Sequence, residues 1–273
     1  MKLPCSVFVF VLLCSACARS PTGRPQLRLV GDDQMTKMGL EAFDEVKSET
    51  PETKDSNASQ YVACVAKAVT AEAKSEGDWE VRVFESKEVN AFALPGGKIG
   101  VYTGLLGVTA NQDQLATVLA HEVAHVTAKH GNARVSSALA TNAGLELTSA
   151  FAGKSTPMKR EALGLLGLGA QVGILLPYGR DQETEADVIG LDLMAKSGFD
   201  PRASVELWRN MAKATGDKQP PTFLSTHPSH EGRIEELSAR MPAAQQHFVA
   251  AREAGKAPRC RSAGAERSAQ ALP

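Results

Sequence analysis

The sequence predicts an α+β protein that is mostly helical, with a small antiparallel sheet ahead of its longest helical part. From Trp79 to Val83 apolar residues alternate with charged ones, as in a half-buried strand. Two more extended runs, Val89 to Leu94 and Lys98 to Tyr102, flank the turn signal Pro95-Gly96-Gly97. From Thr103 onward nearly every segment has helical spacing. Strands followed by helices indicate an α+β domain and not a βαβ sheet.

Two amphipathic helices are expected before the sheet, near Asp32 to Glu49 and Asn57 to Lys74, where apolar residues recur at three- and four-residue spacing. Another helix is expected after Asn111, which is a good N-cap, and should continue through Val126. The Leu- and Gly-rich stretch from Ala162 to Pro177 is short for a membrane span of about 20 residues. A buried helix is the favoured interpretation of that stretch, and a membrane dip is the alternative.

The charge balance argues against a polyanionic partner. The chain has 273 residues, of which 43% are hydrophobic, and a formal net charge of -1. This composition supplies a core but no field that would attract nucleic acid. The Gly-rich segment from Gly164 to Gly173 lacks the Lys-Ser or Lys-Thr pair of a phosphate-binding loop. We therefore expect no nucleic acid, no nucleotide and no unfolding driven by ATP.

Residues 1–17 are typical of a secretory signal peptide, because a basic residue precedes the apolar run Val7 to Leu13 and small residues follow it. The small residues ending at Cys17 resemble a bacterial lipobox, although Cys14 stands where Leu is usual. Acylation of Cys17 is favoured over plain cleavage. An acylated Cys17 would anchor an otherwise soluble lipoprotein. We expect export to the periplasm, with a lipid anchor in the outer membrane of a Gram-negative bacterium.

The rest of the chain divides into three parts. Residues 18–30 are expected to be a linker, 31–247 the folded domain, and 248–273 a C-terminal tail that is mobile except near Cys260. After the signal, Cys64 and Cys260 are the cysteines that remain. Because an exported chain meets an oxidising compartment, a Cys64–Cys260 disulfide is the favoured interpretation. Two unpaired thiols are the alternative.

An HExxH sequence lies within the helix expected after Asn111. Its histidines, His121 and His125, are one turn apart, so both imidazoles can reach one metal ion. Glu122 points about 100° away from His121 and flanks the open position of the metal, where a carboxylate can move protons. The alternative is a pair of surface histidines. Apolar neighbours make that alternative costly, because unpaired imidazoles would be buried among them.

A third ligand must come from elsewhere in the chain. The metzincin spacing is absent and His130 falls on the wrong face of the helix. In a second expected helix, Glu183 and Asp187 share a face, whereas Glu185 lies about 200° from Glu183. Glu183 can therefore bind the metal while Asp187 accepts the other N–H of a liganding imidazole. A solvated helix start is the alternative for this acidic segment.

These residues resemble the gluzincin zinc metallopeptidases, the family of HtpX-like and CAAX prenyl endopeptidases, and within it the exported, single-domain LoiP-like branch related to BepA. The resemblance runs from about Asn57 to Leu237. Besides the HExxH sequence and the Glu183–Asp187 pair, the matching segments are Val89–Gly97, Tyr102–Leu106, Gly198–Pro201 and Thr226–Pro228. The resemblance implies a zincin fold with the sheet beside the active-site helix. It also implies one Zn²⁺ held by His121, His125 and Glu183, with Glu122 as general base.

The resemblance implies further site residues. Asn90 and Ala91 would lie in an extended segment that binds the substrate backbone as an added strand, and an ordinary edge strand is the alternative. His227 and His230 precede the last expected helix. Either could cap the open position of the zinc as a self-inhibiting ligand or stabilise the oxyanion, and Arg233 is a further candidate. Surface positions are the alternative for these residues.

The sequence thus favours a zinc endopeptidase that acts on unfolded or misassembled envelope proteins. The alternative is a non-proteolytic assembly lipoprotein with a structural zinc site. Glu122 discriminates between the two, because a structural site is normally closed by a fourth ligand and has no use for a carboxylate there.

Overall fold

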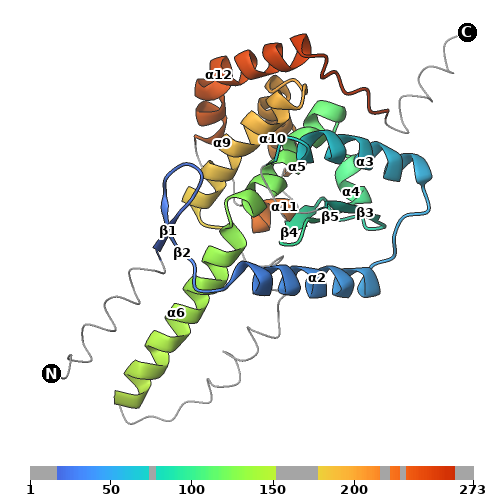
Figure 1. The fold of residues 1–273 in the computed structure, drawn as a ribbon. Helices are drawn as coiled ribbons and strands as arrows, with labels where there is room; N and C mark the ends of the chain where they lie inside the picture. The colour runs from blue at the N-terminus through green and yellow to red at the C-terminus, as the bar shows by residue number, and fades with distance from the viewer. Residues whose placement is uncertain (1–16, 74–77, 152–177, 216–221, 228–231, 262–273) are drawn as a thin grey trace, which may run out of the picture.

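A three-stranded sheet and the long helix that follows it form the centre of the structure (Figure 1). The computed structural model describes residues 17–73, 78–151, 178–215, 222–227 and 232–261. The strands are β1 (Cys17–Arg19), β2 (Pro25–Leu27), β3 (Glu80–Phe84), β4 (Ala91–Leu94) and β5 (Lys98–Tyr102). The helices are α2 (Asp32–Glu49), α3 (Ser56–Thr70), α4 (Thr103–Leu106), α5 (Gln112–Thr127), α6 (His130–Phe151), α9 (Arg180–Lys196), α10 (Arg202–Thr215), α11 (Thr222–Thr226) and α12 (Arg233–Glu253).

The central sheet has the order β3-β5-β4, so the last strand in the chain lies in the middle. β4 and β5 form the expected antiparallel hairpin, with Ala91 opposite Val101. β3 differs from the expectation, because it runs parallel to β5 and pairs Glu80 with Lys98. After β3 the chain forms β4 at the other edge of the sheet, and β5 then fills the position between these two strands. The α+β class is confirmed, and the sheet is mixed.

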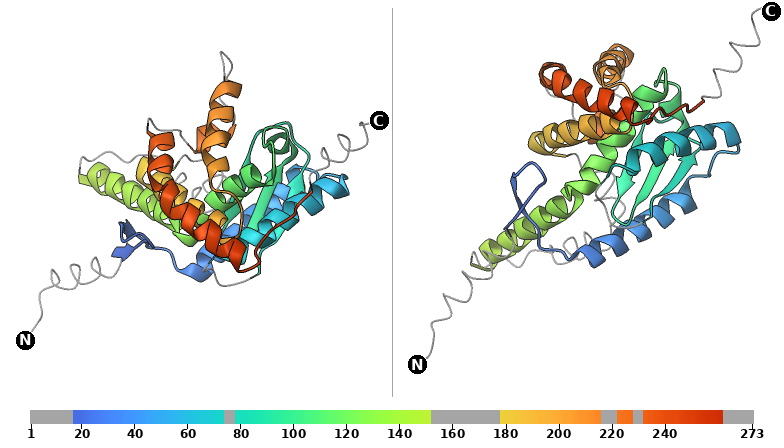
Figure 2. Two further views of the ribbon diagram at one scale, coloured as in Figure 1. Left: turned by 90° about the horizontal axis from the view of Figure 1, so that it is seen from above. Right: turned by 45° about the horizontal axis from the view of Figure 1, so that its top comes forward.

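The two faces of the sheet carry different side chains, as the alternation along a strand requires. Ile99 and Val101 belong to the main core with α3 and α5. Phe84 and Phe92 belong to a second cluster with Phe43 of α2, and the three rings lie 6.1 to 6.4 Å apart. α2 therefore covers one face of the sheet, and α3 and α5 cover the other (Figures 1 and 2).

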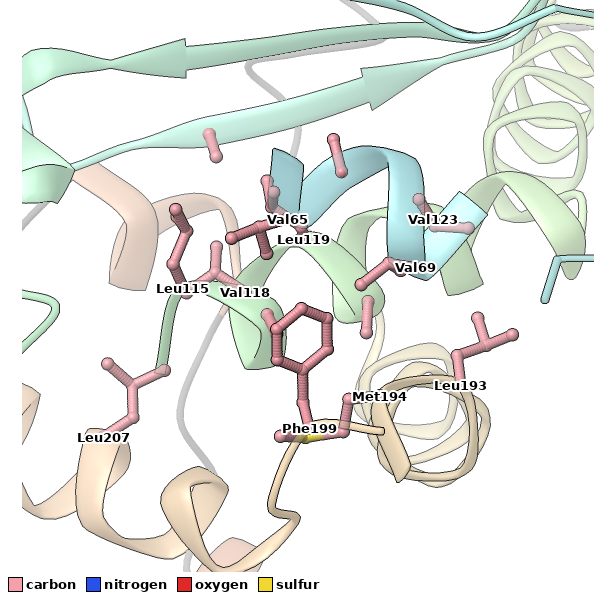
Figure 3. Close-up of a cluster of buried hydrophobic side chains, with 14 of the residues drawn as sticks. Val65, Val69, Leu115, Val118, Leu119, Val123, Leu193, Met194, Phe199 and Leu207 are labelled. Carbon is pink, nitrogen blue, oxygen red and sulfur yellow. The ribbon is translucent and has the colours of Figure 1, made fainter. Parts of the chain in front are cut away.

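Helix α5 is buried on all sides. Each residue from Gln114 to His125 is buried, which is expected only for a helix at the centre of a domain. Figure 3 shows Val69 of α3, Val118 and Leu119 of α5 and Met194 of α9 meeting around the ring of Phe199. The core thus holds α5 in place from the sheet side and from the side of α9.

α5 and α9 approach each other closely at Gly190. A Cβ added to Gly190 would lie 3.0 Å from the backbone N of His121 and 3.1 Å from the carbonyl carbon of Ala120. Only glycine lets the two backbones come this near without a shift. The crossing places Gly190, in the second half of α9, against the middle of α5.

The segment expected as a linker, residues 18–30, contains a β-hairpin. β1 pairs with β2 in antiparallel register, and the turn between them uses Gly23 at φ 90. Gln26 donates a side-chain hydrogen bond to the carbonyl of Ala128 (3.1 Å), and the N–H of Leu29 donates to Ser136 Oγ (2.8 Å). The hairpin is therefore bound to the body of the protein near α6 and α9 (Figure 2).

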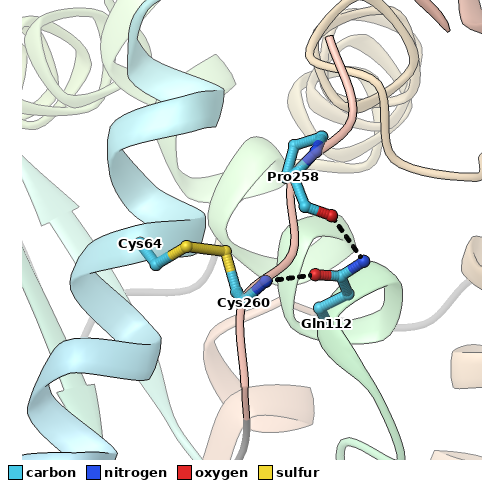
Figure 4. The surroundings of a disulfide bond; sticks show 4 residues. All are labelled: Cys64, Gln112, Pro258 and Cys260. Atoms are coloured by element: carbon cyan, nitrogen blue, oxygen red, sulfur yellow. Dashed lines mark hydrogen bonds between the residues drawn. A yellow bond between two sulfur atoms is a disulfide. The ribbon is translucent and has the colours of Figure 1, made fainter.

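The segment that contains Pro258 and Cys260 is bound to α3 and α5. Cys64 and Cys260 form a disulfide, which confirms the predicted pairing. Gln112 donates to the carbonyl of Pro258 (3.0 Å) and accepts from the N–H of Cys260 (2.8 Å) (Figure 4). α12 runs past residue 247, the expected end of the domain, to Glu253.

Some expectations fall on residues outside the described ranges: most of the signal segment, the buried helix expected at 162–177, and His230. Among the helices that the structure describes, none combines the length and apolar character needed to cross a bilayer.

Replacing Cys64 with Ser is expected to destabilise the protein. The disulfide joins residues 196 positions apart, and the chain-entropy model gives about 4 to 5 kcal/mol as an upper value for such a loop. Urea unfolding of the oxidised wild type and of Cys64→Ser measures the loss. The double variant Cys64→Ser/Cys260→Ser should lose no more than either single variant. Equal stability of wild type and Cys64→Ser would contradict the contribution of the bond.

The change Gly190→Ala is expected to lower the free energy of unfolding by about 1 to 3 kcal/mol, because the new methyl group is forced against the backbone of α5. Gly131→Ala is the matched control, since its Cβ would meet Met35 Cε at an ordinary 3.9 Å. Within α6 that control should gain about 0.5 to 1 kcal/mol from helix propensity. A gain of the same size at Gly190 would show that the helices do not cross this closely.

Candidate metal centre

α5 places three polar side chains in the dry centre of the molecule. Asn111 caps the helix by accepting from the N–H groups of Asp113 and Gln114. His121, Glu122 and His125 are each no more than 3% exposed. The Nε2 atoms of the two histidines lie 3.1 Å apart. The one-turn spacing of the HExxH sequence thus brings both imidazoles to one point.

The first turn of α9 adds a carboxylate at this point. Glu183 Oε1 lies 3.4 Å from His125 Nε2, and its Oε2 lies 3.5 Å from His121 Nε2. Asp187, one turn later, lies with Oδ1 3.0 Å from His121 Nδ1. The structure therefore brings together the two imidazoles, the carboxylate and the orienting aspartate that the sequence analysis selected.

His227 completes the cluster from the end of α11. Its Nδ1 lies 3.1 Å from Glu183 Oε1 and 3.2 Å from His121 Nε2. Each of the residues His121, His125, Glu183 and His227 offers one ligand atom, and these atoms lie within 4.8 Å of one another. Of the two predicted roles of His227, its position matches that of a fourth ligand.

The separations between donor atoms fit a tetrahedral zinc site. Ligand atoms at about 2.0 to 2.1 Å from a tetrahedral ion lie about 3.3 Å from each other. The distances among the histidine nitrogens and from each histidine to its nearer Glu183 oxygen given above, from 3.1 to 3.5 Å, are close to this value, and one ligand atom from each of the four residues lies within 4.8 Å of the others. Nitrogen and carboxylate oxygen are also the ligand types that zinc takes in proteins.

The hydrogen bonds behind the imidazoles place a proton on each Nδ1. His121 Nδ1 faces an Asp187 carboxylate, which can only accept, so Nδ1 carries the proton. His125 Nδ1 lies 2.9 Å from Nδ1 of His130, whose Nε2 faces Glu185 and therefore donates to it. His125 Nδ1 must then be the donor to His130. When His121 is neutral, the lone pairs of the two Nε2 atoms face each other across 3.1 Å, and a cation bound between them would remove their repulsion.

The electrostatics of the cluster favour positive charge at its centre. Burial lowers the pKa of His121, but hydrogen bonds with Asp187 and Glu183 outweigh burial and raise it to about 9. Burial raises the pKa of Glu183, yet hydrogen bonds with the three histidines hold it well below its usual range. Burial keeps the pKa of His125 well below its usual value. The carboxylates thus favour positive charge at the centre of the cluster, either as a proton on His121 or as a bound metal ion.

Arg233 lies behind the ligands and not on their open side. Its Nε donates to Asp187 Oδ2 (2.6 Å) and its Nη2 donates to Glu183 Oε2 (2.7 Å). Its guanidinium also lies 3.8 Å from the centre of the Trp208 ring. With 2% exposure, Arg233 fixes the two carboxylates, and its contacts do not match the oxyanion role that the sequence suggested.

Glu122 lies beside the cluster and next to strand β4. Its carboxylate lies near the backbone of Ala93, and its Oε1 has no hydrogen-bond partner among the described residues. Burial raises the pKa of Glu122. His227 Nε2 lies 3.4 Å from Oε1. Glu122 is therefore a buried carboxylate with one unused oxygen at the metal centre.

The predicted strand residues Asn90 and Ala91 lie at the edge of the sheet. Asn90 accepts through its carbonyl from the N–H of Tyr102, and its side chain accepts from the N–H of Ala91 (3.0 Å). Because backbone groups alternate in direction along a strand, the free edge of β4 is offered by Ala91 and Ala93. The side chain of Asn90 already satisfies one group of that edge.

Three residues near the cluster have no role in the sequence prediction. The ring of Tyr178 stacks on His125 at 3.8 Å, and the guanidinium of Arg134 lies 3.8 Å from the centre of the same ring. His130 and Glu185 stand behind His125. The sequence contains no pattern that points to Tyr178. The spacing of His130 and Glu185 in the sequence does not select them as ligands, and it indicates no other role for them.

A cavity of about 570 Å³ reaches the cluster between α2, β4 and the start of α6. His125, Tyr178, Ala93 and Leu94 are among the residues that line it. The edge of β4 and the metal centre therefore share one open space.

Comparison with known proteins agrees with this geometry. Residues 53–241 match the family model described as Peptidase family M48. The chain is 35% identical over 229 residues to the mitochondrial metalloendopeptidase OMA1 of Schizosaccharomyces pombe, covering 82% of this chain and 66% of the relative. It is 35% identical over 241 residues to OMA1 of Bos taurus, covering 82% and 45%.

A bacterial relative is also similar. The chain is 30% identical over 225 residues to the beta-barrel assembly-enhancing protease of Yersinia pestis, covering 80% of this chain and 46% of the relative. The chain thus spans about half to two thirds of the length of these relatives. With the family model matched over more than half of its length, the chain belongs to peptidase family M48.

Proposed function

We propose that the chain is a zinc-dependent endopeptidase that cleaves unfolded or misassembled proteins of the bacterial envelope without ATP. The observation that carries the proposal is the pair of Nε2 atoms 3.1 Å apart beside the Glu183 carboxylate, together with an oxygen of the neighbouring Glu122 that has no hydrogen-bond partner among the described residues. His121, His125 and Glu183 would hold one Zn²⁺. The printed names of the relatives, metalloendopeptidase and protease, support the same activity.

The bound ion would supply Lewis acidity for a water and for the scissile carbonyl. Glu122 would then act as the general base and, later, as the general acid. Its raised pKa and its unused Oε1 suit it to take a proton from the attacking water and return it to the leaving amine. Asp187 holds His121 in the tautomer that leaves Nε2 free. Arg233 compensates the charge of both carboxylates.

The free edge of β4 is the proposed binding site for the substrate backbone. An extended peptide paired with Ala91 and Ala93 would run beside Glu122 and through the 570 Å³ cavity. Main-chain pairing requires an extended substrate. We therefore infer that unfolded segments are cleaved in preference to folded ones.

The site of action is inferred from the N-terminus and from one relative. Residues 1–17 have the pattern of a lipoprotein signal that ends at Cys17. The Yersinia pestis relative is named for β-barrel assembly, which supports an envelope role. The OMA1 relatives are named as mitochondrial, and the proposal of an envelope setting rests on the signal-like pattern of residues 1–17.

His227 favours a second function that must be distinguished from the first. Four protein ligands are typical of a structural zinc site, whereas a catalytic site keeps one position open. With Nδ1 of His227 in the cluster, the site is closed. A non-proteolytic assembly factor would have this arrangement permanently. In a peptidase, His227 is a cap that leaves when substrate binds.

The change Glu122→Gln is expected to lower the rate of casein cleavage by about 10²- to 10⁴-fold, because the proton acceptor is lost. Zinc content should stay at the wild-type level, since Glu122 is not a ligand. Zinc analysis and casein degradation by the purified full chain measure both. The exposed residue Glu45 supplies the control Glu45→Gln, which should keep full activity.

Two results of this experiment would contradict the proposal. Undiminished cleavage by Glu122→Gln would show that Glu122 is not the base. Cleavage of a compact folded protein as fast as casein would show that extended segments are not preferred.

The change His227→Ala is expected to keep zinc bound and to raise the rate of casein cleavage, because removing the cap increases the competent fraction. Zinc content and cleavage rate are compared with those of His247→Ala, a histidine on the surface side of α12 with a 43% exposed side chain. Loss of zinc and of activity in His227→Ala would favour the structural site.

A further inference from the structure

The two histidine ligands are supported in different ways. His121 donates directly to Asp187, whose other contacts come from Arg233. His125 has no carboxylate at its Nδ1. It meets the buried imidazole of His130 at 2.9 Å instead. His130 is 0% exposed.

His130 passes the contact on to Glu185. Its Nε2 lies 3.2 Å from Glu185 Oε2, and the carboxylate accepts this proton. Glu185 is 4% exposed and lies on the side of α9 away from the metal cluster. Because the Glu185 carboxylate can only accept, it fixes which nitrogen donates in each hydrogen bond between Glu185 and His125. Glu185 makes Nε2 of His130 the donor, which leaves Nδ1 as the acceptor for His125.

The N-terminal hairpin completes the environment of Glu185. The hydroxyl of Thr22 donates to Oε1 at 2.6 Å and its backbone N–H donates to the same atom at 3.3 Å. Arg24 Nε donates to Oε2 at 2.9 Å. Thr22 and Arg24 lie more than 150 residues before Glu185 in the chain, within the segment that the sequence marks only as a linker.

We propose that Thr22, Arg24, Glu185 and His130 form a positioning system for the metal ligand His125, so that the hairpin next to Cys17 is part of the metal site. The inference rests on the proposed metal site. It goes beyond that site by assigning a task to the N-terminal hairpin and to two buried residues outside the ligand set. An outer partner of this kind fixes the tautomer and ring orientation of a ligand, and its loss typically weakens metal binding about 10- to 100-fold.

A purely structural role would differ in one respect. A buried Glu185–Arg24 ion pair could simply fasten the hairpin to α9, and its loss would lower stability without touching the metal. The hydrogen bonds through His130 have a further consequence, because the position of Glu185 determines which nitrogen of His125 is free to bind an ion. Metal affinity of the folded protein separates the two roles.

The test measures Zn²⁺ affinity of the full chain by competition with a chromogenic chelator, and the visible absorption of the Co²⁺ form. Arg24→Ala and His130→Leu should weaken Zn²⁺ binding about 10- to 100-fold and alter the Co²⁺ spectrum. Arg19→Ala is the matched control, because Arg19 lies in the same hairpin and contacts only the Gly23 carbonyl in the described hydrogen bonds. It should bind Zn²⁺ like wild type.

A conservative variant refines the test. In His130→Asn the amide oxygen takes the place of Nδ1 and can still accept from His125, so binding should be stronger than in His130→Leu. Thermal unfolding of each metal-free variant reports the structural contribution separately. Lower unfolding temperatures with wild-type Zn²⁺ affinity in Arg24→Ala and His130→Leu would overturn the positioning role. A wild type that binds no Zn²⁺ would overturn the proposed function, and with it this inference.

Discussion

The position of the Glu183 carboxylate between two buried imidazoles is the constraint on which the rest of the structure depends. A charge of this kind is costly in a dry interior unless it is compensated. Arg233 compensates part of it, and the proposed Zn²⁺ at the Nε2 atoms of His121 and His125 would compensate the rest. The close crossing at Gly190 brings the two helices to this distance, and the core around α5 stabilises that crossing.

His121 contacts a carboxylate directly and His125 contacts one through His130, and each carboxylate is held by an arginine from a distant part of the chain. Arg233 begins the last helix, and Arg24 belongs to the first hairpin. The metal centre is thus closed by both ends of the domain. On this view the N-terminal segment, a proposed membrane attachment, and the metal ligand His125 belong to one hydrogen-bonded unit, and the disulfide at Cys260 fastens the other end.

Local sequence patterns were sufficient to predict the parts of the site that depend on helical spacing. His121, His125, Glu183 and Asp187 follow from periodicity on two helices, and the N-cap at Asn111 follows from its residue type. Contacts between distant segments could not be predicted in this way. The parallel pairing of β3, the docking of Thr22 on Glu185 and the stacking of Tyr178 on His125 all depend on tertiary packing. The spacing of His130 does not select it as a ligand, and only the fold shows that it lies directly behind His125.

Zinc anomalous diffraction from crystals of the full chain tests the central claim most directly. The account predicts one anomalous peak about 2.0 to 2.2 Å from Nε2 of His121, Nε2 of His125 and a carboxylate oxygen of Glu183. No peak among these atoms, or a peak bound by the imidazoles while the Glu183 carboxylate lies out of reach, would contradict it.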